Sequence, residues 1–146
     1  MPSGDSAPAD PSSTDAALDG MLRGEPPAVV ALVQRLRRAV TEAHPDLQER
    51  VNTSWYGLAF HHPRAGYICA LFPRRGGVNV GFEQGGVLHD PHGRLTGRGR
   101  TRDVRIEVDA GPDEDEIVLD YLDIAVDVAI DRAAHKAAKV RRTRAT

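Results

Sequence analysis

The first regular pattern in the chain is a stripe of apolar residues that begins after two consecutive prolines, Pro26 and Pro27. Proline suits the first turn of a helix, because the amide hydrogen that it lacks has no helical partner there. The stripe recurs every three or four positions, at Val29, Leu32, Val33, Leu36 and Val40. Since Pro45 disfavours helical geometry at His44, the pattern predicts an amphipathic helix between Pro26 and Pro45.

Aromatic and β-branched residues become frequent after a turn or short helix that we expect at residues 45–51. Three short apolar runs follow, at residues 58–62, 67–72 and 78–82, separated by segments with the Pro, Gly and Arg content of turns. A fourth run, at residues 104–108, alternates apolar with charged side chains, which is the period of a strand with one buried face. Short turns join antiparallel neighbours, so this part of the chain predicts an antiparallel β-meander.

A second long helix is predicted after Gly111 and Pro112, where Asp113 can cap the first turn. Acidic residues at positions 114–116 are favourable near the positive end of a helix dipole. One face of this helix is apolar: Ile117, Val118, Tyr121, Leu122, Ala125, Val128 and Ala129. We therefore expect an α+β fold, an antiparallel meander sheet flanked by an N-terminal and a C-terminal helix that pack on one face.

The two ends of the chain are less regular. Residues 1–25 hold few large apolar side chains and many Ser, Pro, Gly and Asp, so we expect a disordered tail. Its end could form one short apolar turn with Ala16, Leu18, Met21 and Leu22. Residues 134–146 are basic and lack a long apolar stripe, which predicts a frayed tail. The α+β domain is expected to cover residues 26–133.

Composition and charge indicate the class of protein and where it is found in the cell. The chain has 146 residues and a formal net charge of -2, which is ordinary for one globular domain and argues against a dedicated nucleic-acid binder. Its apolar runs are too short to span a bilayer, and its N-terminus lacks the pattern of a secretory signal, so we expect a cytoplasmic protein. Cys69 is the single cysteine and cannot form an internal disulfide. We expect it to be a buried strand residue rather than a reactive thiol.

Several short motifs, taken together, resemble the YdhG-like family of domains of unknown function. They are Trp55-Tyr56-Gly57-Leu58, Val80-Gly81-Phe82, Gly86-Val87-Leu88-His89-Asp90-Pro91, Leu95-Thr96-Gly97-Arg98-Gly99-Arg100 and Arg105-Ile106. The resemblance covers about residues 27–128. The chain departs from the family pattern at Thr96, where Glu is common, and at Arg100, where Lys is usual.

The resemblance implies a frataxin-like α-β(5)-α architecture. Frataxin and its bacterial relatives bind iron through exposed carboxylates, and some members of the YdhG-like family are described as iron chaperones. An iron site is therefore one expectation for this chain, although a shared fold does not by itself imply a shared function.

The acidic face of the second helix is the candidate metal site. Carboxylates at helical spacing can share a hard cation through their oxygen atoms. The expected ligands are Glu116, Asp120, Asp123 and Asp127. The alternative is that these side chains form a solvated face of an amphipathic helix, which needs no ligand. A second metal hypothesis, with His89, Asp90 and His92, rests on two histidines in one loop.

The Gly- and Arg-rich segment that follows is the candidate anion site. Glycines let backbone amides approach an oxyanion, and guanidinium groups bind phosphate or carboxylate. The expected ligand-binding residues are Asp90, Arg98, Arg100 and Arg105, with Trp55 lining the same pocket. The alternative is a fold-defining loop with solvated arginines.

No recognisable nucleophile and base motif occurs, so we do not expect an enzyme. The leading hypothesis is a non-enzymatic module that binds a small anionic ligand or a metal ion. The rival hypothesis is a protein interaction module that forms a homodimer without a small ligand. Weak nucleic-acid contact through the arginine segment and the basic C-terminal tail is a third hypothesis.

Overall fold

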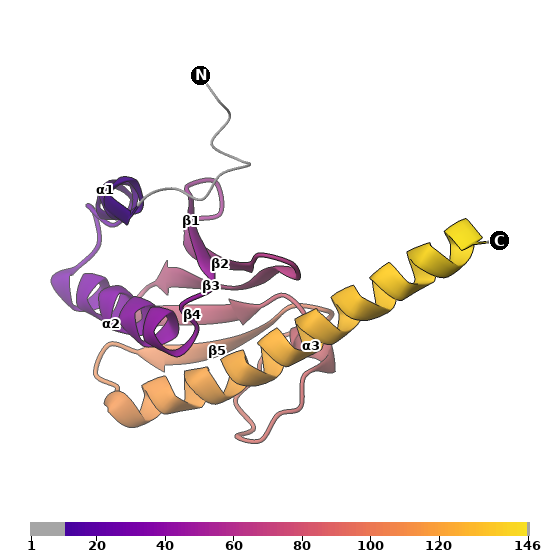
Figure 1. The fold of residues 1–146 in the computed structure, drawn as a ribbon. Helices are drawn as coiled ribbons and strands as arrows, with labels where there is room; N and C mark the ends of the chain where they lie inside the picture. The colour runs from indigo at the N-terminus through magenta and orange to yellow at the C-terminus, as the bar shows by residue number, and fades with distance from the viewer. Residues whose placement is uncertain (1–10, 146) are drawn as a thin grey trace.

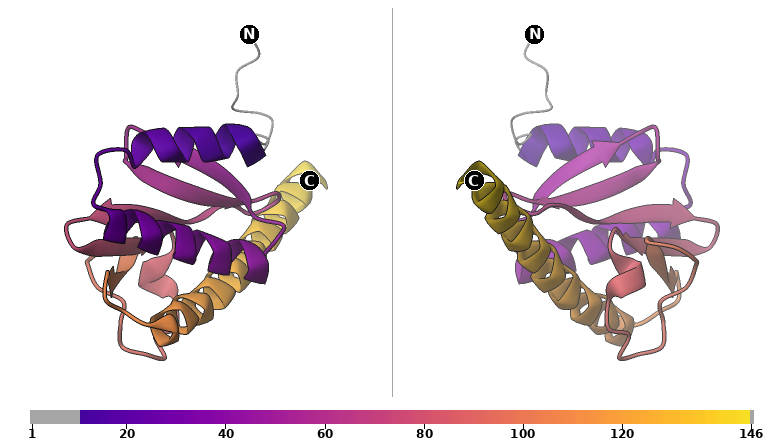
Figure 2. Two further views of the ribbon diagram at one scale, coloured as in Figure 1. Left: turned by 90° about the vertical axis from the view of Figure 1, so that its left-hand side faces the viewer. Right: turned by 90° about the vertical axis from the view of Figure 1, so that its right-hand side faces the viewer.

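A five-stranded antiparallel sheet covered by helices on one side forms the body of the molecule, seen in the computed structural model in Figures 1 and 2. The structure describes residues 11–145. The elements follow in this order: α1 Pro11–Met21, α2 Pro27–Ala43, β1 Gln48–Asn52, β2 Gly57–His62, β3 Gly66–Arg74, β4 Gly77–Phe82, the 3₁₀ helix η1 Gly85–Val87, β5 Arg102–Glu107 and α3 Pro112–Ala145. The expected α+β fold is confirmed.

Each strand of the sheet pairs with the next strand along the chain. The spatial order is β1-β2-β3-β4-β5, and every pair is antiparallel. The register aligns Leu58 with Leu71, Leu71 with Val80, and Val80 with Val104. Since neighbouring side chains along a strand point to opposite faces, these four residues form one apolar row across the sheet. All four are fully buried.

Helices α2 and α3 pack on the apolar face of the sheet. Their apolar stripes join the strand side chains in a single core, to which Leu36 of α2 and Leu122 of α3 contribute fully buried side chains. Arg35 of α2 donates hydrogen bonds to the carboxylate of Asp115 in α3, the shortest from Nε to Oδ2 at 2.9 Å and from Nη2 to Oδ1 at 3.0 Å. This charged pair fixes the two helices relative to each other at the rim of the core.

The opposite face of the sheet carries no helix from the described part of the chain (Figure 2). It presents Ala59, Ala70 and Gly81 side by side across three strands. The Phe72 ring lies over this face, because a Cβ atom added at Gly57 would come 2.7 Å from the Phe72 ring. Small residues therefore let one aromatic ring cover the central strands.

The prediction of a disordered N-terminal tail is wrong for the residues that form the first helix. Residues 11–25 are not a disordered tail, because α1 spans Pro11–Met21 and buries Leu18 completely. Leu22, just after the helix, is 2% exposed and belongs to the same core. Asp15 also pairs with Arg37 of α2, with 2.7 Å between Oδ1 and Nη2. Residues 1–10 of the expected tail lie outside the described residues.

Strand β1 corrects a second expectation. The prediction of a turn or short helix at residues 45–51 is wrong for its second half, which forms the edge strand Gln48–Asn52. Only one residue of this strand, Val51, is apolar. Its strand conformation comes from pairing with β2, in which Val51 faces Leu58.

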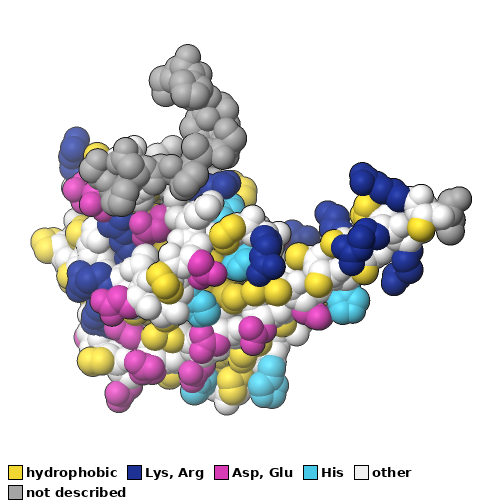
Figure 3. All heavy atoms as spheres, viewed as in Figure 1, with side chains coloured by type: hydrophobic (Ala, Val, Ile, Leu, Met, Phe, Trp, Pro, Cys, Tyr) yellow, Lys and Arg dark blue, Asp and Glu magenta, His cyan; other side chains and the backbone are white. Residues whose placement is uncertain are grey.

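The prediction of a frayed C-terminal tail is wrong, because helix α3 includes this segment. It continues through residues 134–145 instead of fraying, and its last turns project beyond the sheet (Figure 1). Basic side chains gather along this projecting end (Figure 3). None of the helices in the described residues is long and apolar enough to cross a membrane.

Candidate anion-binding site

The loop between β4 and β5 is tied to α3 through one tyrosine. The fully buried Tyr121 donates a hydrogen bond from its hydroxyl group to Oδ1 of Asp90. The same hydroxyl oxygen accepts the backbone N–H groups of His92 at 3.3 Å and Arg94 at 3.1 Å. The hydrogen bond from Tyr121 is the main cause that lowers the pKa of Asp90. Asp90 therefore has a structural role in this loop.

The arginines that we expected beside Asp90 are directed elsewhere. Arg100 pairs through Nη2 with Glu83, and Arg98 is exposed. Arg105 donates from Nη2 to the carbonyl oxygen of Arg75 at 2.6 Å and from Nε to Glu107 at 3.1 Å. Since Val104 and Ile106 point into the core, Arg105 points to the uncovered face, whereas Asp90 contacts α3. The structure does not bring Asp90 and Arg105 together in one site.

The expected metal ligands are spread along the exposed face of α3. Asp120 pairs with His92 and Asp123 pairs with His44, each with 2.7 Å between Nε2 and a carboxylate oxygen. Glu116 and Asp127 are exposed. Within residues 11–145, no three His, Cys, Asp or Glu side chains are grouped so that they could hold a metal ion. The geometry therefore gives no support to an iron site on this helix.

A different cationic hollow lies where α3 leaves the sheet. It has a volume of about 460 Å³ and lies between the β2–β3 turn, the end of β4 and one side of α3. Arg64 comes from the turn, and Arg132 and Lys136 come from successive turns of α3. Tyr67 and Gln84 line it from the sheet side. The remaining lining residues are alanines, so the hollow contains no acidic side chain.

Three positive charges line this hollow without a carboxylate partner. Among the described residues, no salt bridge involves Arg64, Arg132 or Lys136, whereas Arg35 and Arg94 are paired with carboxylates. Like charges four residues apart on a helix repel each other by a few tenths of a kcal/mol. A bound anion would relieve this repulsion and accept hydrogen bonds from the guanidinium and ammonium groups.

Gln84 adds an unsatisfied polar atom to the hollow. Its Oε1 atom is buried and accepts no hydrogen bond from the described residues. An unpaired buried acceptor costs roughly 1–3 kcal/mol, and rotation of the carboxamide would present its NH₂ donor instead. Tyr67 also lines the hollow, and burial is the main cause that raises the pKa of its hydroxyl group.

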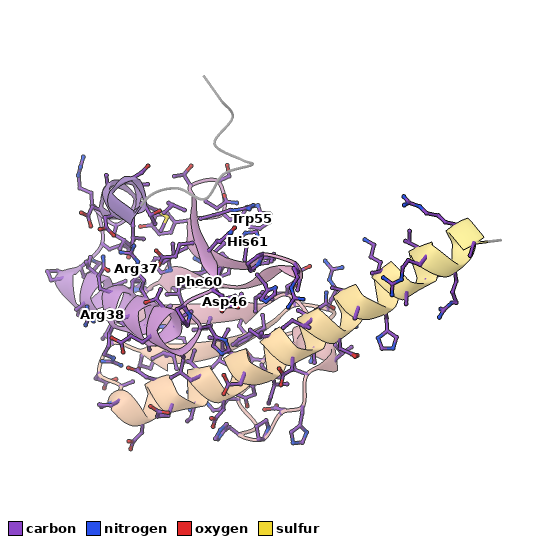
Figure 4. All side chains as sticks on the ribbon, in the orientation of Figure 1. Arg37, Arg38, Asp46, Trp55, Phe60 and His61 are labelled. Carbon is purple, nitrogen blue, oxygen red and sulfur yellow. The ribbon has the colours of Figure 1, made fainter. Side chains whose placement is uncertain are left out.

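Trp55 lies on the uncovered side of the sheet and belongs to a row of rings. Its ring centroid is 6.5 Å from that of Tyr67, and the Tyr67 centroid is 5.4 Å from that of His61. Figure 4 labels Trp55, which lies in the turn of the β1–β2 hairpin, and His61, which pairs with Gln48 at the opposite end of β2. Trp55 is 61% exposed. Because Tyr67 also lines the cationic hollow, the row of rings and the hollow share one residue.

Sequence reasoning missed the hollow because its charges lie far apart in the chain. Arg64 and Arg132 are in separate elements, and only the fold places them together. One signal was present in the sequence: Arg132 and Lys136 are four residues apart, which places them on one side of a helix.

The comparisons with known proteins found no relatives. No family model, no curated protein and no solved structure matches this chain.

Proposed function

We propose that the protein is a non-enzymatic binding module for a small anion and that the cationic hollow is its site. One observation supports this proposal most: Arg64, Arg132 and Lys136 line the same cavity, and no acidic side chain lines it. Phosphate and carboxylate groups match the fork of an arginine side chain, and charge-assisted hydrogen bonds are the stronger ones in proteins.

The lining of the hollow supports binding rather than catalysis. It holds no His, Asp, Glu, Cys or Ser, the side chains that most often serve as bases or nucleophiles. The raised pKa of Tyr67 keeps its hydroxyl group protonated at neutral pH. A protonated hydroxyl group is a poor base.

Calorimetric titration of inorganic phosphate into the purified protein tests the proposal. We expect saturable binding that weakens at least tenfold in the double variant Arg132→Gln with Lys136→Gln, because two charge-assisted contacts are lost. The matched control is Lys139→Gln with Arg142→Gln, which removes the same charge from exposed positions of the same helix outside the hollow. It should change the affinity less than threefold.

Two outcomes would overturn the proposal. One is the absence of saturable phosphate binding at low salt. The other is an equal loss of affinity in the two double variants, which would indicate diffuse attraction to the basic end of α3. The homodimer alternative and the cytoplasmic location stay predictions, and light scattering at several protein concentrations tests the first of them.

A further inference from the structure

The last turns of α3 carry a dense group of positive charges. From residue 132 to the end of the described helix no acidic residue occurs, and the basic residues are Arg132, Lys136, Lys139, Arg141, Arg142 and Arg144. All of them are exposed. This end of the helix projects away from the sheet (Figures 1 and 3). The basic end of α3, residues 132–145, is therefore open to a partner.

Residues 11–145 supply no counter-charge for most of this basic end. None of the salt bridges among them involves the basic residues at positions 139–144. The acidic residues of α3 all lie in the first part of the helix and end at Asp131. The formal net charge of -2 therefore averages regions of opposite charge, and it does not argue against an anionic partner for the basic end.

The basic side chains surround the helix instead of forming one face. Residues two positions apart in an α-helix point about 160° apart around its axis. Lys139 and Arg141 therefore point to nearly opposite sides, and so do Arg142 and Arg144. Because like charges three or four positions apart on a helix repel each other, a partner that neutralises all of them must carry negative charge on two sides of the helix.

The apolar surface of the basic end does not suit a lipid interface. Apart from the basic residues it consists mainly of alanines. Val140, 43% exposed, is the one large apolar side chain exposed there. A helix that lies in a membrane surface needs bulky apolar residues on the face opposite its basic residues. A flat anionic surface would also reach cations on one side of the helix only.

We propose that the basic end of α3 binds in the major groove of double-stranded DNA. The groove is about 12 Å wide and admits an α-helix, and phosphates line both of its edges. At about 1.5 Å per residue, the segment from Arg132 to Arg144 is roughly 18 Å long, which is enough to cross the groove. The contacts of lysine and arginine go to phosphates, so binding is independent of base sequence.

This inference does not depend on the proposed anion site. Lys139, Arg141, Arg142 and Arg144 do not line the cationic hollow, which takes only Arg132 and Lys136 from this part of the helix. The two sites can therefore be separated by substitution.

Fluorescence anisotropy with a labelled DNA duplex of about 20 base pairs, two helical turns, tests the inference on the full chain. We expect saturable binding at about 50 mM salt. If about four phosphates are neutralised, the affinity should fall about a hundredfold between about 50 and 200 mM salt, because counterions are released on binding. No saturable binding at low salt would overturn the inference.

A pair of double variants locates the contact. Lys139→Gln with Arg142→Gln should weaken duplex binding about tenfold and make its salt dependence shallower by about two contacts, and glutamine preserves the helix propensity. The matched control is Arg38→Gln with Arg98→Gln, which removes the same charge from exposed positions outside α3. It should change the affinity less than threefold. Equal losses in the two double variants would overturn the inference.

One variant in the hollow distinguishes this inference from the proposed function. Arg64→Gln should weaken phosphate binding and leave duplex binding unchanged, because Arg64 lines the hollow but lies outside α3. If phosphate binds and the duplex does not, the DNA inference is wrong and the anion site stands. If the duplex binds and phosphate does not, the reverse holds. Tighter binding to the single strand, or to vesicles of anionic lipid, than to the duplex would also overturn the DNA inference.

Discussion

Tyr121 in α3 and Asp90 in the β4–β5 loop are joined by a hydrogen bond between segments that lie 31 residues apart. The tyrosine hydroxyl group also accepts two backbone N–H groups of the loop. It is thus the point where a Gly-rich connection attaches to the helical layer. The motif that contains Asp90 works here as an anchor of the fold.

Replacement of Tyr121 by Phe should destabilise the protein by roughly 1–3 kcal/mol, because the buried hydroxyl group and its contacts are lost. Urea unfolding followed by circular dichroism measures this loss. Tyr56→Phe is the matched control that removes one hydroxyl group with a single partner, and it should cost less. An unchanged free energy of unfolding in Tyr121→Phe would show that the loop does not depend on this hydroxyl group.

The same substitution should change the pH dependence of stability. The folded state lowers the pKa of Asp90, chiefly through the hydrogen bond from Tyr121. A lowered folded-state pKa stabilises the protein above the unfolded pKa of about 4 and loses this effect as the pH falls through the folded value. In Tyr121→Phe the pKa of Asp90 should move up toward its ordinary value, which a carboxyl NMR titration measures.

The ion pair between Arg35 and Asp115 should matter more than other charges of α2. Arg35→Met leaves the Asp115 carboxylate, 13% exposed, without its cation and should cost about 2–3 kcal/mol. Arg38→Met changes an exposed arginine of the same helix and should cost less than about 0.5 kcal/mol. Adding Asp115→Leu to Arg35→Met should restore part of the stability. No recovery in this double variant would contradict the unpaired-charge explanation.

Docking of α1 should be measurable as a contribution to global stability. Leu18→Ala removes a fully buried side chain from the shared core and should destabilise the whole domain by about 2–4 kcal/mol in urea unfolding. Asp19→Ala, at the exposed next position, should change stability by less than about 0.5 kcal/mol. An unchanged unfolding midpoint in Leu18→Ala would mean that α1 does not pack on the core.

Cys69 should give the protein an alkaline sensitivity. Complete burial raises the pKa of its thiol to about 12 in the folded state, whereas the unfolded thiol ionises near about 8.5. Stability should therefore be fully present below about pH 8.5 and fall as the pH rises toward 12. Comparison of the unfolding free energies of the protein and of Cys69→Ala between pH 8 and 11 should reveal this slope. Parallel pH profiles would contradict the prediction.

The sequence predicted the elements whose side chains alternate or repeat clearly. The stripe at Leu32, Leu36 and Val40 predicted α2, because one buried face of a helix is visible as local spacing. Strand β1 has one apolar residue and depends on its partner strand, so local pattern could not identify it. Helix α1 was missed because only Leu18 and Leu22 mark its buried side.

The candidate site was harder to predict than the fold. Arg98, Arg100 and Arg105 are close in sequence, but Arg105 lies in β5 and bonds to Arg75 and Glu107, whereas Arg100 pairs with Glu83. The hollow also depends on the continuation of α3 past the sheet. Residues 134–145 lack a strong apolar stripe, so their sequence did not predict a helix there. The cationic hollow that we propose as the anion site is therefore lined by other residues than those that local composition indicated.

The order of the strands has a consequence for how quickly this chain can fold. Since every strand pairs with its neighbour along the chain, successive hairpins can form without closing long loops, and such local topologies reach the native state faster than sheets with distant pairings. The long-range step is the packing of α3 on the sheet, in which Asp115 pairs with Arg35, 80 residues away in the chain. We expect helix docking, rather than sheet formation, to be the late event in folding.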